Sequence, residues 1–351
     1  MNKLLKLIFS FGVIVVVLVF LWNPASVPSS TFSSLYHKIS MTLVPYQRKA
    51  PTGRQVASIV YLDAHGLPPG TMRALKGMKA TEVYLYVAYH SDAYYQIPKN
   101  PYGLAEPADV LRQALSQLHQ AGYPVVAVIS SALLDPNQAT AAGKQILQPG
   151  SSLFDPTKAK PLLTQMVQSL MNYPIDGLYI GEPYSNTQAM QSTQAASSGA
   201  WMSLYQSLLQ LTQPAKLPMD MVLPDNFAVG AALENRSGLP DNFPHLPFAA
   251  VGIDQENAYT GHPNDLNVFQ RIVQKTVAIA NNRPSITEIS LRQGDLKTPI
   301  SPQFFDQEVQ IASQEHVNVL LIFANEFWDS SPYQKQYAQA LQGFLAGSGS
   351  S

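Results

Sequence analysis

The chain has 351 residues, of which 46% are hydrophobic and only 13% are charged, so it can bury a large core and is not intrinsically disordered. Its net charge of −1 supplies no basic field for a phosphate backbone, which argues against a nucleic-acid-binding protein. The complete absence of cysteine excludes disulfides, thiolate nucleophiles, iron–sulfur clusters and cysteine-ligated zinc.

The N-terminus has the features of a membrane-targeting segment. Lys3 and Lys6 precede an apolar run over residues 7–22, interrupted only by Ser10 and Gly12. Positive charge on this side is typical of the cytoplasmic flank of an inserted helix, and no clean small-x-small cleavage site follows. We therefore expect residues 1–22 to be an uncleaved signal anchor, with the rest of the chain on the periplasmic or extracellular side. A cleaved signal peptide and secretion are the alternative.

Three further segments follow the anchor. Residues 23–55 are rich in proline, serine and threonine and are expected to form a linker. Residues 56–346 carry the patterns of a folded domain, and residues 347–351 form a flexible Gly/Ser tail.

Short β-branched, almost wholly apolar runs recur along the folded domain and alternate with helical patterns. The strands are expected at residues 58–62, 82–87, 124–129, 175–180, 219–223, 249–253, 285–291 and 317–323. Apolar residues at helical spacing mark helices at residues 107–121, 160–171, 201–211, 266–280, 303–313 and 333–345. Near-continuous apolar strands indicate a parallel sheet covered on both faces.

The alternation predicts an α/β fold, a single (β/α)₈ TIM barrel, with a doubly wound open sheet as the main rival. No glycine-rich phosphate-binding fingerprint follows any strand, so no nucleotide is expected as a ligand.

In a parallel barrel the functional residues lie at the carboxyl ends of the strands. These ends are rich in carboxylates, amides and aromatic rings, a combination that suits a carbohydrate because rings stack on sugar faces while polar groups bond hydroxyls. The expected substrate-binding residues are Asp63, His65, Tyr86, Tyr184, Asp254, Tyr259, Arg292 and Trp328. The seven histidines show no paired metal-ligand spacing, so we expect neither a metal nor another cofactor.

The strongest motif lies around the fourth expected strand, where Asp-Gly-Leu-Tyr-Ile-Gly-Glu occupies residues 176–182. It resembles the pattern that leads into strand four of glycoside-hydrolase-like barrels, and the resemblance implies that Glu182 lies in the active centre. Residues 181–183, Gly-Glu-Pro, also resemble the Asn-Glu-Pro acid/base motif of a large clan of retaining glycosidases, with glycine in place of asparagine. Asp176, near the start of the strand, is interpreted as structural.

A second resemblance concerns the partner carboxylate. The run from Pro284 to Ile289 is similar to a strand-seven motif of the same clan in which the glutamate is the nucleophile, and this implies that role for Glu288. Strand alternation turns Glu288 toward the barrel interior, although an apolar run that continues to Leu291 would leave it in mid-barrel. Glu326, beside Trp328 after the eighth strand, is the competing candidate.

The sequence thus predicts an exported, membrane-anchored glycoside hydrolase that cleaves a cell-surface or extracellular polysaccharide through paired carboxylates. Glu182 would be the general acid/base, and Glu288 or Glu326 would be the nucleophile or water-activating base. A non-catalytic glycan-binding barrel is the alternative. A scaffold of an envelope assembly is a third class, which would require a large exposed apolar patch.

Overall fold

The computed structural model describes residues 48, 53–62, 66–87, 108–130, 156–181, 194–224, 227–228, 232–237, 239–254, 265–293, 298–330 and 332–347, all within one compact unit, Gln47–Ser351. The expected anchor at residues 1–22 lies outside these residues, as does most of the expected linker. Within the described ranges, no helix is both long and apolar enough to cross a membrane.

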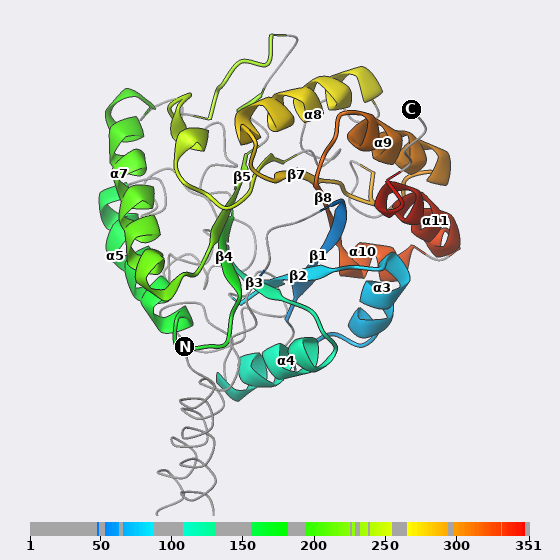
Figure 1. Cartoon of the computed structure of the whole chain (residues 1–351), viewed down its shortest axis with the longest axis horizontal. Coiled ribbons are helices and arrows are strands. Elements are labelled where there is room, and N and C mark those ends of the chain that lie inside the picture. Colours follow the sequence, from blue (N-terminus) through cyan, green and yellow to red (C-terminus); the bar gives the residue numbers. More distant parts are fainter. Residues whose placement is uncertain are drawn as a thin grey trace, which may run out of the picture. The chain divides into compact units, whose positions relative to one another are not determined.

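Eight strands form a closed parallel barrel in the order of the sequence, and the last strand pairs with the first. The strands are β1 (Gln55–Tyr61), β2 (Glu82–Tyr86), β3 (Val125–Ser130), β4 (Gly177–Gly181), β5 (Met219–Leu223), β6 (Val251–Ile253), β7 (Ser285–Glu288) and β8 (Val319–Phe323). The predicted barrel is confirmed, and closure between β1 and β8 excludes the doubly wound open sheet. Figure 1 looks into the ring that the strands form.

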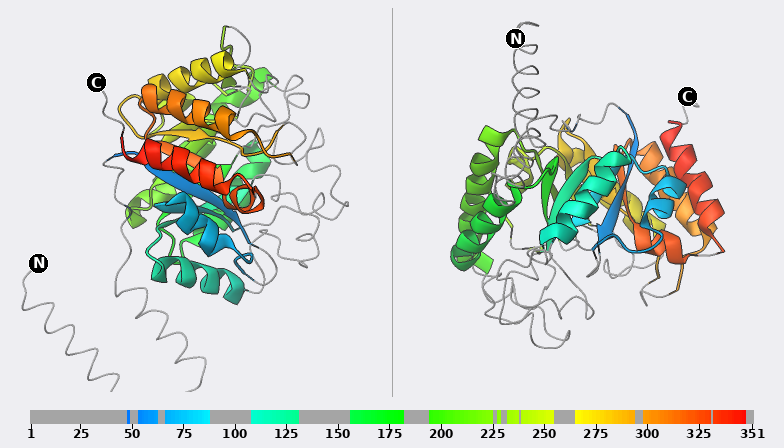
Figure 2. Two further views of the ribbon diagram at one scale, coloured as in Figure 1. Left: turned by 90° about the vertical axis from the view of Figure 1, so that its right-hand side faces the viewer. Right: turned by 90° about the horizontal axis from the view of Figure 1, so that it is seen from below.

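Helices cover the outside of the ring (Figures 1 and 2). They are α3 (Thr71–Met78), α4 (Ala108–Gln120), α5 (Pro156–Leu170), α7 (Gln194–Thr212), α8 (Leu266–Ala280), α9 (Pro302–Gln314), α10 (Ala324–Asp329) and α11 (Gln334–Leu345), with short 3₁₀ helices at Gln213–Ala215 and Phe243–His245. Neither α3 nor α10 was expected from the sequence. The expected strand at residues 285–291 is too long, because β7 ends at Glu288.

Local signals explain the well-predicted elements. Asp265 caps α8, its carboxylate accepting hydrogen bonds from the amides of Asn267 and Val268 at 3.0 and 3.2 Å. Ser301 caps α9 in the same way, ahead of a proline at the first helical position. Capping side chains satisfy amides that have no partner inside the helix, and proline at this place loses nothing because its missing N–H would be unpaired.

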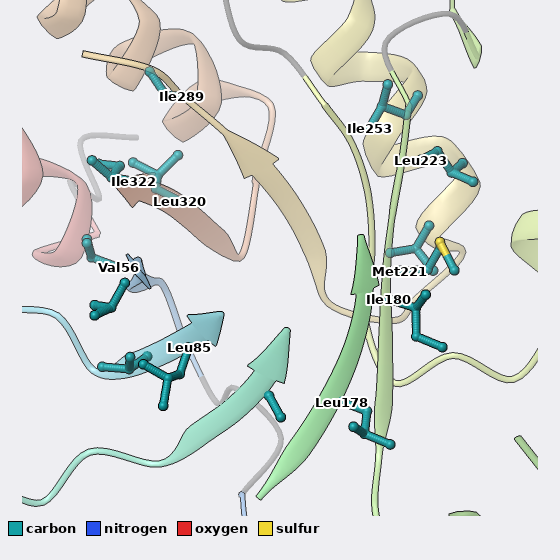
Figure 3. Packing of buried hydrophobic residues seen from close by; sticks show 14 of the residues in the cluster. Val56, Leu85, Leu178, Ile180, Met221, Leu223, Ile253, Ile289, Leu320 and Ile322 are labelled. Atoms are coloured by element: carbon teal, nitrogen blue, oxygen red, sulfur yellow. The ribbon is translucent and has the colours of Figure 1, made fainter. Parts of the chain in front are cut away.

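Strand alternation divides the apolar core into two layers. Side chains on the outer face of the strands, such as Leu178, Ile180, Leu320 and Ile322, belong to the large layer between strands and helices (Figure 3). Side chains on the other face form a smaller cluster inside the barrel. Its members are Ala57, Ile59, Tyr84, Val126, Val128, Tyr179, Val222, Ala250, Ile286, Val319, Leu321 and Phe323. Because both faces are buried, the strands are mostly apolar, with buried acids at Glu82, Asp220 and Glu288 as exceptions.

The shortest strand, β6, contains a glycine where the barrel is tightest. A Cβ added to Gly252 would lie 2.4 Å from the carbonyl oxygen of Ile286 on the neighbouring β7. No real side chain tolerates that distance to a backbone atom, so β6 and β7 can pair here only because residue 252 has no Cβ.

We expect Gly252→Ala to destabilise the barrel by about 1–3 kcal/mol, the usual range for overpacking a core. Gly343 in α11 is the matched control, because its added Cβ would meet nothing within 4 Å. Gly343→Ala should stabilise by about 0.5–1 kcal/mol through helix propensity. Urea unfolding of both variants measures the difference, and equal effects would contradict the close approach of β6 and β7.

Candidate active site

The carboxyl ends of β1, β2 and β8 carry a row of aromatic rings. Tyr61 and Tyr86 are the last residues of β1 and β2, and their ring centroids lie 4.6 Å apart with planes inclined by 27°. Phe323, the last residue of β8, continues the row. Its ring centroid lies 5.9 Å from that of Tyr61, and the two ring planes are inclined by 10°. Tyr61 and Tyr86 are only half-buried and pack against the cluster inside the barrel. Stacked rings with exposed surface at a barrel mouth can hold the apolar face of a sugar.

Two carboxylates lie at the ends of β6 and β7, the strands that continue the ring on the other side of β8. Glu288 is the last residue of β7, and Asp254 directly follows β6. Ile286 and Ala250 belong to the cluster inside the barrel, so alternation turns Glu288 and Asp254, two and four residues later, to the same interior face.

These two acidic residues are neighbours in the sheet and are almost completely buried. Ile253 aligns with Thr287 in the pairing of β6 with β7, which makes Asp254 and Glu288 the next residues on adjacent strands. Their exposed fractions are 4% and 5%. A carboxylate kept from bulk water acts strongly on charge that develops nearby, which is a requirement for general acid–base work.

Glu326 is held in a different way. It lies in the first turn of α10, where one carboxylate oxygen accepts a hydrogen bond from the Leu291 amide at 2.6 Å and another from the Ser290 hydroxyl at 3.1 Å. Burial raises the pKa of the Glu326 carboxyl, although these two hydrogen bonds and Arg292 oppose the rise. The carboxylate therefore fastens the chain that leaves β7 to the helix that follows β8.

Arg292 and Trp328 make further contacts between α10 and neighbouring segments of the chain. A guanidinium nitrogen of Arg292 lies 3.5 Å from the Asp329 carboxylate at the end of α10. The Trp328 ring carries the Arg73 guanidinium 4.4 Å from its centroid and packs so closely on Gly70 that a Cβ there would lie 2.8 Å from the ring. Trp328 thus joins α10 to the start of α3.

The structure therefore divides the residues selected from the sequence. It brings Tyr86, Asp254 and Glu288 to the interior of the barrel at its carboxyl end, and it places Glu326, Arg292 and Trp328 in contacts among α10, α3 and the end of β7. Glu182, Asp63, His65, Tyr184 and Tyr259 lie outside the described residues. Tyr61 and Phe323 were missed, although each ends an alternating series of interior residues.

Asp176 has the structural role expected for it. Its carboxylate accepts a hydrogen bond from the Val125 amide at 2.8 Å and lies 2.8 Å from Nε2 of His119 in α4. These contacts tie the entry of β4 to β3 and α4. Among the described side chains, no group of three or more His, Asp or Glu is placed to bind a metal ion.

Known proteins with a similar fold are found among solved structures. No protein-family model and no curated protein sequence matches the chain. Among solved structures, the PgaB (BpsB) glycoside hydrolase domain from Bordetella bronchiseptica is similar, with a TM-score of 0.60, 15% identity and coverage of 84% of this chain and 99% of that domain. A group IV chitinase of Ostrinia furnacalis is similar with a TM-score of 0.57 and 8% identity, and the match covers 84% of this chain and 100% of the chitinase chain. The spore cortex-lytic enzyme SleL of Bacillus megaterium is similar with a TM-score of 0.53 and 9% identity, and the match covers 84% of this chain and 75% of the SleL chain. The chain thus has a glycoside-hydrolase-like (β/α)₈ barrel fold.

We expect Glu326→Ala to cost about 1–3 kcal/mol, because it leaves the buried Leu291 amide without its acceptor. Glu326→Gln retains an acceptor oxygen and should cost less. The control is Asp306→Ala, which removes only an exposed hydrogen bond to Gln310. Amide hydrogen exchange at Leu291 should accelerate in the alanine variant alone, and an unchanged rate would rule out the fastening role.

Proposed function

We propose that this protein is an exported, membrane-anchored glycoside hydrolase that acts on a cell-surface or extracellular polysaccharide. The observation that carries the proposal is the placement of Asp254 and Glu288 on the interior face at the carboxyl end of a barrel whose aromatic row lies on β8, β1 and β2. Glycosidic cleavage requires a pair of carboxyl groups beside the scissile bond, and aromatic rings at the same end of the barrel offer a face on which a sugar can stack. The fold likeness to a glycoside hydrolase domain, a chitinase and a cortex-lytic enzyme supports this reaction class.

The mechanism uses two carboxyl groups. Glu182, which follows the last residue of β4, would protonate the glycosidic oxygen as the bond to the anomeric carbon breaks. A second carboxylate would either attack the anomeric carbon or remove a proton from the attacking water. A separation near 5–5.5 Å between the two carboxyl groups corresponds to retention, and about 6.5–9.5 Å corresponds to inversion.

Of the two candidates for the partner, position in the barrel favours Glu288. Glu288 ends β7 on the interior face, whereas Glu326 lies outside the ring of strands in α10 and accepts hydrogen bonds from Leu291 and Ser290. Glu288 is the last residue of β7, and it aligns with Leu321 in the middle of β8.

A glycan-binding barrel without catalysis is the second candidate. The aromatic row of Tyr61, Tyr86 and Phe323 favours it, since stacking rings alone are sufficient to bind a saccharide. An envelope scaffold receives no support, because Met72 is the one large hydrophobic residue of the described surface that is exposed.

We expect Glu182→Gln to slow hydrolysis of a natural glycan by about 10²–10⁴-fold while leaving the folded structure intact, because the amide cannot donate the proton. With an aryl glycoside whose leaving group needs no protonation, the loss should be much smaller. Chitin oligosaccharides, mannan and spore cortex fragments are suitable substrates. The control is Glu315→Gln, which lies at the end of α9. Full activity of Glu182→Gln on every cleaved glycan would exclude it as the acid.

Azide rescue tests the partner carboxylate. We expect Glu288→Ala to abolish turnover and added azide to restore part of it with formation of a glycosyl azide, because a small anion can replace a missing nucleophile. If azide restores turnover in Glu326→Ala but not in Glu288→Ala, Glu326 is the nucleophile instead. If the wild type cleaves no glycan while Tyr61→Ala weakens glycan binding, the protein is a binding barrel.

The anchoring part of the proposal predicts a difference in fractionation. The full chain should remain with membranes after a high-salt wash, because an apolar helix is not released by screening charge. A protein that begins at Gln47 should be soluble. A shortened form released into the soluble fraction of the periplasm would show that the N-terminal segment is cleaved instead.

A further inference from the structure

The end of the barrel opposite the candidate active site holds a buried polar cluster that the proposed reaction does not use. Its centre is Arg48, from the chain just before β1. The guanidinium makes a two-pronged ion pair with Glu82 at the start of β2, one prong being the contact of Nε with Oε1 and the other that of Nη2 with Oε2 at 2.9 Å. Nη1 lies 2.7 Å from the Asp220 carboxylate on β5, on another side of the ring.

A tyrosine in the barrel interior completes the cluster. The Tyr84 hydroxyl donates to Asp220 at 2.6 Å and accepts from Nη2 of Arg48 at 3.2 Å. The side chains of Arg48, Glu82 and Asp220 are exposed by only 7%, 4% and 0%. The guanidinium is thus shared among acceptors on two strands that are not adjacent.

A glycine lies next to the Arg48 guanidinium inside the barrel. Gly177 begins β4 beside the guanidinium, and a Cβ there would lie 3.4 Å from Nη1 and 3.3 Å from a methyl group of Val126. The absence of a side chain at residue 177 therefore keeps the position of the guanidinium open. The planar guanidinium of arginine has donors in fixed directions that match these acceptors, whereas the ammonium group of a lysine would be a point charge without this geometry.

The cluster contains more negative than positive charge. Glu82 and Asp220 face one arginine, and Asp176, which is bound to His119 of α4, adds further negative potential at Glu82. The pKa of Glu82 is raised to about 6, mainly by burial and further by Asp220 and Asp176, while Arg48 acts in the opposite direction and lowers it. Oδ1 of Asp220 has no hydrogen-bond donor among the described residues. Arg48 is therefore the main compensation for two buried carboxylates.

We propose that Arg48 is an acid-sensitive lock that fastens the chain entering β1 to the base of the barrel. Withdrawing the guanidinium at neutral pH would leave two carboxylates uncompensated in a medium of low dielectric, which opposes opening. Protonation of Glu82 removes one of these charges and so weakens the lock.

The direction of the pH effect follows from proton binding. Because Arg48 lowers the pKa of Glu82, the locked base binds fewer protons than the empty base, and acid favours release. The lock is fully closed above the pKa that Glu82 has in the empty base, which is higher than about 6, and it weakens as the pH falls from there to about 6.

Chemical rescue in the full chain tests the lock. Arg48→Ala should lower the melting temperature at neutral pH, and millimolar guanidinium should restore it along a saturable curve, because the ion fits the vacated site. Sodium chloride at equal ionic strength should not. The control is Arg236→Ala, whose exposed pair with Glu234 lies at the surface. Neither it nor the wild type should be stabilised by guanidinium.

The pH dependence tests the switch. The apparent affinity of Arg48→Ala for guanidinium should fall by up to about tenfold between about pH 7 and about pH 5, as expected for one coupled proton. In Arg48→Ala/Glu82→Gln the same affinity should hardly change with pH. Rescue no better than with sodium chloride would overturn the lock, and equal pH dependence in both variants would overturn its acid sensitivity.

The wild-type chain provides a measurement that does not depend on the folding of a variant. The Nε–H of Arg48 should exchange with solvent at least about a hundredfold more slowly than that of Arg236 near pH 7, because it is buried and bound to a carboxylate. This protection should shrink as the pH falls toward about 6, before the barrel unfolds. NMR of the arginine Nε–H signals measures both rates, and equal exchange of the two arginines would refute the lock.

Discussion

Closure of the parallel sheet is the constraint on which the other features depend. When β1 pairs with β8, the sheet has no edge, and both of its faces are buried, one under the helices and one inside the ring. A buried strand face tolerates charge poorly, so polar side chains inside the barrel are confined to its two ends. Arg48, Glu82 and Asp220 lie at the amino end, and Asp254 and Glu288 lie at the carboxyl end.

The two ends meet this constraint in opposite ways. At the base, the carboxylates are compensated by Arg48 and by the Tyr84 hydroxyl, which reaches from β2 to β5. At the mouth, half-buried Tyr61 and Tyr86 leave aromatic surface open beside the ring of strand ends. A compensated, enclosed cluster favours a fixed position of its side chains, whereas partly exposed rings can contact a ligand. This contrast is why we place chemistry at one end and fastening at the other.

Glu288 and Glu326 show how position separates residues of the same type. Glu288 is a buried acid at the end of β7, and Glu326 is a half-buried acid three residues after the end of the adjacent β8. Glu326 lies on the first turn of a helix, close to the chain that turns away after β7, and its oxygens bind that chain. Glu288 ends its strand on the interior face, where the backbone is already paired within the sheet. The fastening by Glu326 keeps the segment directly after Glu288 in place, so the two acids support one another structurally.

The sequence by itself determined the barrel, because the pattern of apolar strands and amphipathic helices is local. Where end signals are also local, the bounds were predicted closely: β5 ends before Pro224, and α8 begins at its cap Asp265 and ends at Asn281, whose φ is 48°. Alternation likewise turned Glu288 inward. Tertiary structure decided the rest. Only the packing of β7 against α10 shows that the strand stops at Glu288 and that Leu291 bonds Glu326. No sequence pattern could show that Arg48, in a segment predicted as linker, compensates charges that lie 34 and 172 residues further on, because the burial that makes those charges costly exists only once the barrel closes.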